Sequence, residues 1–494
     1  MMQSCGIPCP SVLLILSLFV ALLSVVVAQA IDVNFEECRI SATETCALSS
    51  LSFGKTKIYP GGNTRCYTEE YEYWFQVDKP TVPDGQDYDN NSPDDTYFSN
   101  HPGLLLYFEG GGTCWSTDSC PPLAVPFPFN RTNSFFNRSY ALNPYQTWTT
   151  VIVTYCTGDL FVGDAVTSDG RTYFNGINNT KAVLKWVADN VGNTATEANP
   201  IFPAKIVFHG LSAGSIGIVA WQRVLFQWRN QAFQDYPIKP TTTVFFDAFE
   251  GLVKLEIQQL TFDAWDFCSN TDLLFTPEEI QLCKQGETDL LRYSHLYLIE
   301  NYRDILVAHI TSKGDLTQYM TYCGGGLSNI ETLDPILPDT SLLLDLGFLF
   351  GEAIPSFSGS EVAELLGCCQ ADFYQTMIDR FQEYHALAAK QGQNNVVSYL
   401  MNGNGHAWSA VLYFYEISST TRNSTRLGID IKGGQPGLAE WIYSIVNRVD
   451  GDEIHSVCSP GFGFGTIPDV WPWPFGNYRC DDEVSSQSFA VTDF

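Results

Sequence analysis

The segment Gly210-Leu211-Ser212-Ala213-Gly214 places a serine between two glycines, each two residues away. The apolar run 206–208 predicts a short buried strand before it, and the apolar residues of 216–228 predict a helix after it. A serine on a sharp strand-to-helix turn exposes its hydroxyl as a nucleophile, and flanking glycines avoid clashes with the strand and the helix. In the alternative interpretation, this serine only caps the helix.

A serine nucleophile needs a base and an acid that orients the base. His406 is the best candidate for the base, because it lies in the glycine-rich loop "NGNGHAW" after a strand predicted at 395–402. Asp315 follows one predicted strand and Asp247 ends another, and both precede His406, which fits the chain order nucleophile, acid, histidine. Each aspartate also fits a helix N-cap. Chain order therefore leaves the acid open.

The third requirement is a set of backbone N–H groups that bind an oxyanion. Gly111 and Gly112 follow a predicted buried strand in "LLLYFEGGG" (104–112), and glycine amides are open to a ligand. The amide of Ala213, directly after the serine, is the other expected donor. A phosphate-binding loop is the alternative, but no Lys-Ser or Lys-Thr of that motif follows the glycines.

Strands and helices alternate through most of the chain, which predicts an α/β fold with a mostly parallel sheet covered on both faces. Further strands are predicted at 150–156, 242–247 and 304–311, and a helix at 178–191. We expect one domain over 31–458, with a helical insert around 252–300, and a Pro/Gly/aromatic-rich tail over 459–494.

The first thirty residues read as a targeting segment. An uncharged apolar run from Ser11 to Val27 is followed by Ala28-Gln29-Ala30, a small-x-small cleavage pattern. We expect a signal peptide over 1–30, with an uncleaved anchor as the alternative because the run is nearly long enough to span a bilayer. No other stretch is apolar enough to span a membrane.

Other features agree with export to a secreted, extracellular or cell-wall location. Of the 15 cysteines, Cys5 and Cys9 precede Ala30, so 15 − 2 = 13 remain and at least one is unpaired or intermolecular. Cys114–Cys120 and Cys458–Cys480 are the plausible local pairs. Glycosylation sequons stand at Asn90, Asn130, Asn137, Asn178 and Asn423. The net charge of -29 argues against a nucleic-acid partner, and no zinc-type cysteine or histidine spacing predicts a metal site.

Several motifs in order resemble the pectin acetylesterase family, which also contains the Notum carboxylesterases. The stretch "WTTVIVTYCTGDLFVGD" (148–164) carries the most specific likeness, and "LLLYFEGGGTC", "GLSAGS" and "DAFEG" resemble the oxyanion loop, the serine turn and the segment after the next strand. "GDLTQ" resembles the family's Asp-x-x-Gln. In four respects the chain departs from the family. Thr113 replaces a tryptophan, Ser215 replaces a glycine, the context "NGNGHAW" of His406 differs from the family's usual one, and the interval between the acid and the histidine is long.

The resemblance implies an α/β-hydrolase-like fold, a Ser212–Asp315–His406 triad with Asp315 rather than Asp247 as its acid, and no cofactor. It also implies a secreted carboxylesterase whose substrate is an acetylated polysaccharide such as pectin. Two alternatives stand beside it: a Notum-like esterase that removes a lipid from a protein, and a non-catalytic surface glycoprotein on the same fold.

Overall fold

The computed structural model describes residues 35–80, 103–114, 135–236, 239–269, 272–286, 289–312, 315, 318, 322, 370–393, 395–401, 437–448, 453–458 and 488–490. By its internal contacts the chain divides into two units, Met1–Glu36 and Glu37–Phe494. Nearly all of the described residues belong to the second unit. The predicted signal peptide lies outside the described residues.

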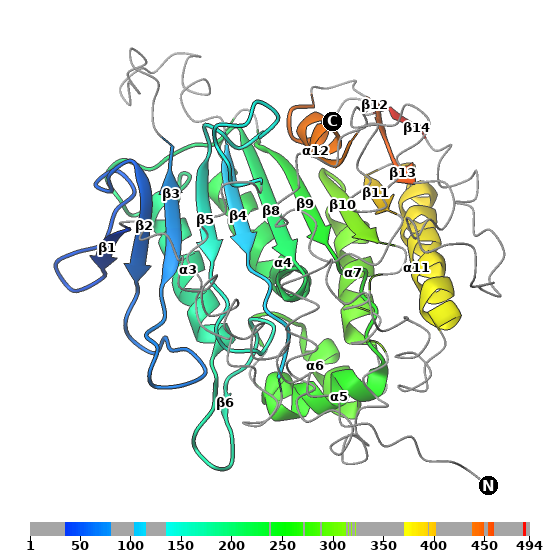
Figure 1. Ribbon diagram of the computed structural model, residues 1–494, viewed down its shortest axis with the longest axis horizontal. Helices are drawn as coiled ribbons and strands as arrows, with labels where there is room; N and C mark the ends of the chain where they lie inside the picture. Colours follow the sequence, from blue (N-terminus) through cyan, green and yellow to red (C-terminus); the bar gives the residue numbers. More distant parts are fainter. Residues whose placement is uncertain are drawn as a thin grey trace, which may run out of the picture. The chain divides into compact units, whose positions relative to one another are not determined.

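A ten-stranded sheet organises the described part of the chain (Figure 1). Its order is β1 (Glu36–Arg39), β2 (Gly54–Tyr59), β3 (Phe75–Lys79), β5 (Thr149–Val153), β4 (Leu104–Phe108), β8 (Lys205–Leu211), β9 (Thr241–Asp247), β10 (Ile305–Ser312), β11 (Val396–Met401) and β13 (Val457–Cys458). The β2–β3 and β3–β5 pairs are antiparallel, and every neighbouring pair from β5 to β13 is parallel. The predicted parallel sheet is confirmed.

The order of the strands creates a switch point. β4 leads along the chain to β5 on one side, whereas β8 lies on the other side of β4. In open α/β sheets, ligands bind at the carboxyl ends of the strands where the winding reverses in this way. The loops after β4 and β8 therefore lie where a binding site is expected.

Alternate side chains of the strands enter two separate cores. Leu104, Leu106 and Phe108 of β4 pack into one core, and Leu105 and Tyr107 pack into the other. This alternation follows from the period of two in a strand, and both faces are apolar because both are covered. The buried strands thus explain the continuous apolar runs in the sequence.

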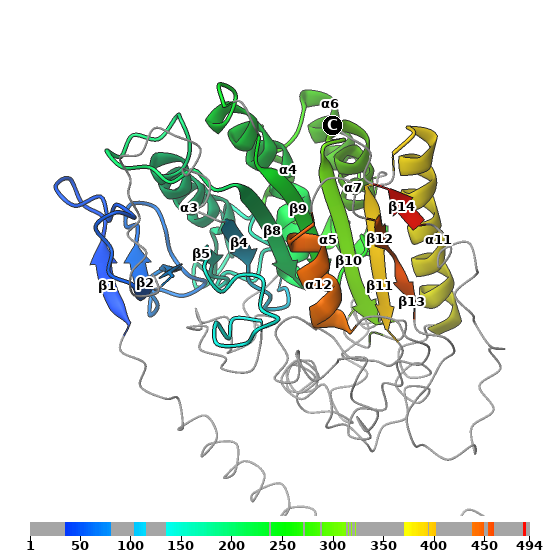
Figure 2. The same ribbon diagram turned by 90° about the horizontal axis from the view of Figure 1, so that it is seen from above.

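Helices cover one face of the sheet and a single described helix covers the other (Figure 2). The first group comprises α3 (Gly176–Asn190), α4 (Ala213–Ala232), α7 (Leu290–Asn301) and α11 (Gln370–Lys390). On the opposite face lies α12 (Leu438–Val446), whose buried residues Leu438, Trp441, Ile442 and Ile445 recur at helical spacing. This one-sided apolar stripe is what attaches α12 to the sheet.

The expected helical insert is present between β9 and β10. It consists of α5 (Leu255–Ala264), the short 3-10 helix η1 (Phe267–Ser269), α6 (Pro277–Gln285) and α7. Thr276 caps α6, since its hydroxyl accepts from the Glu279 amide while the Glu279 carboxylate accepts from the Thr276 amide. The insert packs onto the same core as α4.

Smaller elements complete the described part of the fold. β6 (Ala165–Val166) pairs with β7 (Tyr173–Phe174), and β12 (Glu453–His455) pairs with β14 (Ser488–Ala490). Disulfides join Cys38 to Cys46, Cys66 to Cys156 and Cys268 to Cys283. Such bonds are typical of proteins that fold in oxidising compartments.

Cys114 is disulfide-bonded as well, and its predicted partner Cys120 lies outside the described residues, as does Cys480. Within the described ranges, no helix combines the length and apolarity needed to cross a bilayer.

The strand order, the serine turn after β8 and the flanking helices together define an α/β-hydrolase-like fold, as predicted.

Candidate active site

Ser212 lies on a sharp turn between β8 and α4. Its backbone angles are φ 51° and ψ -117°, a conformation that is strained for any residue with a side chain. The two flanking glycines make this turn possible. A Cβ on Gly210 would lie 2.4 Å from the Ser215 Cα, and a Cβ on Gly214 would lie 2.0 Å from the Phe108 carbonyl oxygen. Both glycines are therefore required by close approach, as the sequence predicted.

The Ser212 hydroxyl makes no capping hydrogen bond to α4. Ser212 occupies the N-cap position of α4 without a side-chain capping bond, so the structure does not support the interpretation in which this serine only caps the helix. The Ser212 amide donates to the Asp247 carbonyl over 2.7 Å, which ties the turn to the end of β9. The side chain is half-buried and stands at the N-terminus of α4, where the helix dipole favours negative charge.

The glycine loop after β4 approaches this turn closely. A Cβ on Gly110 would lie 3.2 Å from the Ser212 Cβ and 2.8 Å from the Leu211 carbonyl oxygen. Gly111 is half-buried, and Gly112 is exposed with φ +73° and open space around it. The fold thus brings the predicted oxyanion residues Gly111, Gly112 and Ala213 to the same turn as Ser212. Their role as donors remains a prediction.

Tyr155, which follows β5, packs against the glycine loop and supports it. Its ring occupies the space where a side chain on Gly111 would go, with a Cβ there lying 2.5 Å from the ring. Its hydroxyl donates to the Gly112 carbonyl over 3.0 Å and accepts from the Leu160 amide over 2.9 Å. Burial raises the pKa of this phenol well above its usual range, so it is a neutral donor.

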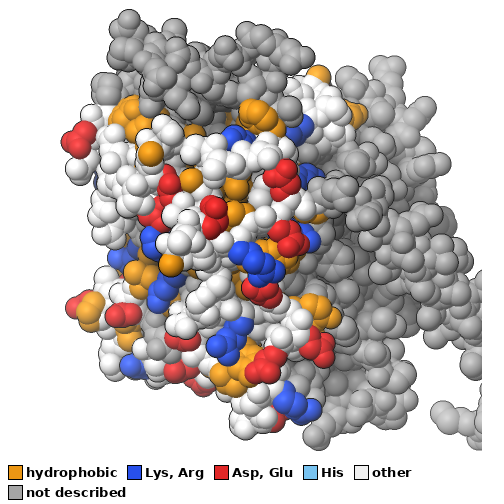
Figure 3. Space-filling model, turned by 90° about the vertical axis from the view of Figure 1, so that its left-hand side faces the viewer, with side chains coloured by type: hydrophobic (Ala, Val, Ile, Leu, Met, Phe, Trp, Pro, Cys, Tyr) orange, Lys and Arg blue, Asp and Glu red, His pale blue; other side chains and the backbone are white. Residues whose placement is uncertain are grey.

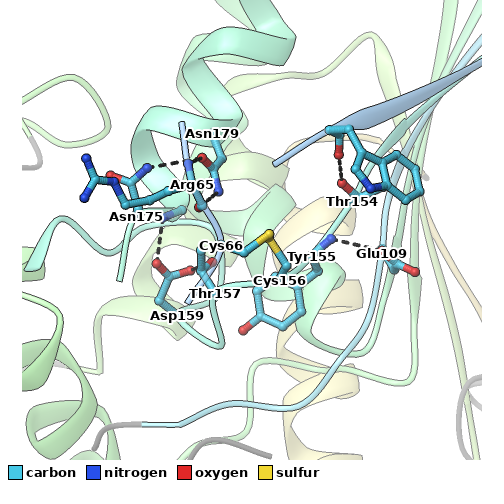
Figure 4. The surroundings of a disulfide bond; sticks show 12 residues. Arg65, Cys66, Glu109, Thr154, Tyr155, Cys156, Thr157, Asp159, Asn175 and Asn179 are labelled. Atoms are coloured by element: carbon cyan, nitrogen blue, oxygen red, sulfur yellow. Dashed lines mark hydrogen bonds between the residues drawn. A yellow bond between two sulfur atoms is a disulfide. The ribbon is translucent and has the colours of Figure 1, made fainter. Parts of the chain in front are cut away.

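The backbone of Tyr155 is fixed as well. Its amide donates to the buried Glu109 carboxylate over 2.9 Å, and the next residue forms the Cys66–Cys156 disulfide (Figure 4). Figure 4 shows the Tyr155 ring directly below this disulfide. The hydrogen bonds of Tyr155 and the adjacent disulfide therefore fix the glycine loop beside Ser212.

Both candidate acids lie at the same edge of the sheet as Ser212. Asp247 ends β9, opposite Leu211 of β8 in the parallel register, and Asp315 follows β10, with its amide donating to the Ser312 carbonyl over 3.2 Å. Both side chains are fully buried. The structure therefore brings Ser212, Asp247 and Asp315 to one edge.

Gln318 holds the carboxylate of Asp315. The Gln318 amide N–H donates to Asp315 Oδ1 over 3.0 Å, and Gln318 Nε2 donates to Asp315 Oδ2 over 2.9 Å. Nε2 also donates to the Thr311 hydroxyl over 3.0 Å. The bond from the Gln318 amide is the one that the alternative interpretation, a helix N-cap, predicts for Asp315. A carboxylate held in one orientation is also what the acid of a triad requires, and that role stays a prediction.

His406 lies outside the described residues. β11, which precedes it, is parallel to β10 and ends at Met401, so the chain leaves β11 at the edge that carries Ser212. Its proposed role as the base remains a prediction.

Four other histidines are buried in the described cores. His209 lies among aromatic rings and stacks on Phe135 and Phe245, and burial lowers its pKa to about 3. His295 and His309 stack on each other and on Tyr384 of α11. His385 lies beside Ser398. Burial lowers the pKa of each of these groups too. Neutral, enclosed imidazoles of this kind are poor general bases at neutral pH.

Two of the predicted glycosylation sites fall within the described residues. The Asn137 side-chain oxygen accepts from the amide and the hydroxyl of Ser139, its sequon partner. The Asn178 amide instead donates to Asp164 and Asn175 at the start of α3. Asn90, Asn130 and Asn423 lie outside the described residues.

Among the described residues, one group of potential metal ligands comes together: Cys38, Glu44 and Cys46. The two sulfur atoms are bonded to each other. They are therefore not thiolates, and thiolates are the form that binds metals.

The sequence did not single out Gly110, Tyr155 or Gln318. A third consecutive glycine and the Tyr-Cys pair were visible, yet their role depends on how β4, β5 and β8 lie together. Gln318 had a sequence signal, because "GDLTQ" places a glutamine three residues after Asp315.

No protein-family model matches the chain, and no curated protein matches it. Two crystal forms of the Wnt deacylase Notum from Drosophila are similar in structure, each 13% identical and covering 83% of this chain and 97% of the Notum chain. Their TM-scores are 0.45 and 0.43. At this level the similarity carries no inference about the site or its chemistry.

Proposed function

We propose that this protein is a secreted serine carboxylesterase that removes O-acetyl groups from a polysaccharide such as pectin. One observation carries the proposal: Ser212 is held at φ 51° on a glycine-bounded turn, directly beside a glycine loop at the switch point of the sheet. Backbone strain of this kind persists only where the surroundings enforce it, and it is typical of reactive sites.

In the proposed mechanism, the Ser212 hydroxyl attacks the carbonyl carbon of the ester while His406 takes its proton. Asp315, oriented by Gln318, holds the imidazole in the right tautomer and stabilises its cationic form. The amides of Gly111, Gly112 and Ala213 bind the oxyanion. His406 then protonates the departing alcohol, and it later activates the water that releases acetate from Ser212. No metal or cofactor takes part.

The preference for acetyl esters of a polysaccharide rests on the motif resemblance to pectin acetylesterases. The longest matching stretch, 148–164, includes Tyr155, which supports the glycine loop. A lipid-ester substrate, as in the Notum carboxylesterases, requires room for a long acyl chain, and the length of the accepted chain therefore separates the two.

The first test is hydrolysis of p-nitrophenyl acetate by the wild type and by Ser212→Ala. We expect loss of nearly all turnover in the variant, on the order of 10⁴-fold or more. Ser444→Ala, which removes a hydroxyl on α12, is the matched control and should keep full activity. Equal rates in the wild type and Ser212→Ala would remove Ser212 from the mechanism.

A second experiment separates narrow specificity from absence of catalysis. A fluorophosphonate probe labels an activated serine whatever the ester preferred. Labelling of the wild type and not of Ser212→Ala supports the esterase even where p-nitrophenyl acetate is a poor substrate. A folded wild type that neither labels nor hydrolyses esters is instead a non-catalytic glycoprotein. Turnover that rises from acetyl to long acyl esters would favour lipid removal.

A further inference from the structure

The carboxyl group of Glu250 is buried just beyond the end of β9. Its side chain has no solvent exposure, and no hydrogen bond of regular geometry reaches either of its oxygens. Its backbone is fixed, because the Tyr384 hydroxyl of α11 donates to the Glu250 carbonyl over 2.9 Å. Gly251, at φ +79°, follows it. A buried acceptor without a partner costs about 1–3 kcal/mol.

A second unpaired polar atom lies nearby. Gln318 uses its side-chain nitrogen on Asp315 and Thr311, while its Oε1 atom is buried and without a hydrogen bond. A carboxylate cannot satisfy this oxygen, because both are acceptors. A protonated carboxylic acid supplies the missing donor.

Burial and two neighbouring carboxylates favour the neutral form of Glu250. Burial is the main cause that raises its pKa well above the usual range, and the carboxylates of Asp315 and Asp247 raise it further. The Thr311 hydroxyl and the Gln318 amide act in the opposite direction, which also places both groups within reach of Glu250. The Tyr384 phenol of α11 has a raised pKa, so it stays neutral and adds no charge beside Glu250.

We propose that Glu250 keeps a proton at neutral pH and donates it in a hydrogen bond to Gln318 Oε1. With its oxygen held by Glu250 and its nitrogen bound to Asp315, Gln318 cannot rotate, and the carboxylate of Asp315 stays in one orientation. Glu250 is then a positioning residue that acts through Gln318. This role rests on the proposed function, since it takes Asp315 as the acid of the triad.

The proton on Glu250 is tested without any substrate. Infrared difference spectra between the wild type and Glu250→Gln at pH 7 should contain the carbonyl band of one protonated carboxylic acid. Glu279→Gln is the matched control, because the Glu279 carboxylate is also buried but is paired with Arg223 over 2.6 Å. The spectrum of Glu279→Gln should still contain the carbonyl band of the protonated acid. A spectrum without the band in the wild type would overturn the proposal.

The positioning role is tested by kinetics. Glu250→Gln retains a donor and should keep kcat within about twofold, with the acid limb of the pH profile unchanged. Glu250→Met, of similar length but without a donor, should lower kcat about tenfold with KM nearly constant. If Glu250 were ionised, Glu250→Gln would instead lower the pKa of the acid limb, because a negative charge near the triad is lost.

The two proposals fail in different ways. Loss of the infrared band together with esterase activity that depends on Ser212 would overturn only the role of Glu250. A band without any esterase activity would leave the proton assigned and overturn the positioning role with the proposed function. Circular dichroism and melting curves of each variant show that it is folded.

Discussion

Single atoms at the turn around Ser212 decide whether the site can form. Gly214 is the clearest case, because the Phe108 carbonyl lies where its Cβ would go. We expect Gly214→Ala to lower the free energy of unfolding by about 3 kcal/mol or more, since a backbone carbonyl cannot move aside as a flexible side chain can. Chemical denaturation measures this change.

The matched control for Gly214→Ala is Gly392→Ala. Gly392 has φ +69° but nothing within 4 Å of an added Cβ. This substitution should cost only the backbone strain of about 1–2 kcal/mol. Equal losses in the two variants would mean that the close approach of Phe108 to the turn does not govern its stability.

Tyr155 offers a second substitution of one atom. Tyr155→Phe removes the hydroxyl that donates to Gly112 and accepts from Leu160, so the glycine loop loses its support. We expect kcat for an acetyl ester to fall roughly 10- to 100-fold with little change in KM, because a displaced oxyanion donor weakens binding of the transition state alone. Steady-state kinetics give both constants.

Tyr173→Phe removes the same atom from a half-buried tyrosine, whose hydroxyl donates to Glu69 over 2.8 Å. It should leave kcat unchanged. A Tyr155→Phe enzyme with normal kcat but lower stability would show that this hydroxyl serves only the fold.

Asp159 links pH to the position of a whole helix. One of its oxygens accepts from the Gly176 amide at the start of α3 over 2.7 Å, and the other accepts from the Thr157 hydroxyl over 2.6 Å. Burial raises the pKa of Asp159 from 3.8 to about 6, although its hydrogen bonds oppose this rise. The native state therefore binds this proton more tightly than the unfolded chain does.

The stability of the protein should consequently fall as the pH rises through this window. Between about pH 4 and pH 6 the native state holds more protons at Asp159, so its contribution decreases with pH, by about 3 kcal/mol at most, and then stays constant. Unfolding curves of the wild type and Asp159→Asn across this range measure the difference. The fall in the free energy of unfolding with pH that Asp159 causes should vanish in Asp159→Asn. It should persist in Asp235→Asn, which changes an exposed aspartate. An unchanged slope would mean that Asp159 is ionised throughout.

The sequence predicted the individual elements better than their arrangement. The apolar runs that became β4, β5, β8, β9, β10 and β11 were visible because strands buried on both faces need continuous apolar residues. The exchange of β4 and β5 in the sheet order was not visible, since no local pattern encodes which strands become neighbours. The Cys66–Cys156 disulfide spans 90 residues and lacked a signal for the same reason.

The same contrast holds for the candidate site: residues at fixed local spacing were predicted, whereas contacts between distant segments were not. Ser212 and the glycines were predicted because a strained turn imposes residue types at fixed spacing. The support that Tyr155 gives to Gly112 depends on a contact between segments 43 residues apart, which spacing does not reveal. Gln318 lies only three residues after Asp315, and "GDLTQ" showed that spacing. Chain order did not separate Asp247 from Asp315, because one ends β9 and the other follows β10 at the same edge of the sheet. Only the resemblance of "GDLTQ" to a family motif favoured Asp315.

The charge of the whole molecule bears on the polymer that it can approach. The full chain has a net charge of -29, although acidic and basic side chains are interspersed on the described part of the face in Figure 3. Such a net charge repels polyanions over about 10 Å at 0.1 M salt. A heavily charged pectin backbone is therefore a harder substrate to approach than a neutral acetylated polymer.

We expect this repulsion to appear as a salt dependence that differs between substrates. With acetylated polygalacturonate of low methyl-ester content, kcat/KM should rise roughly tenfold as the ionic strength increases from about 0.01 to about 0.3 M, because screening removes a barrier to association. With a neutral acetylated polysaccharide or p-nitrophenyl acetate, kcat/KM should stay nearly constant, and these substrates serve as controls. A decrease with salt on the polyanion alone would show that a local cationic groove outweighs the net charge, and pectin carboxylates would then be part of what the enzyme recognises.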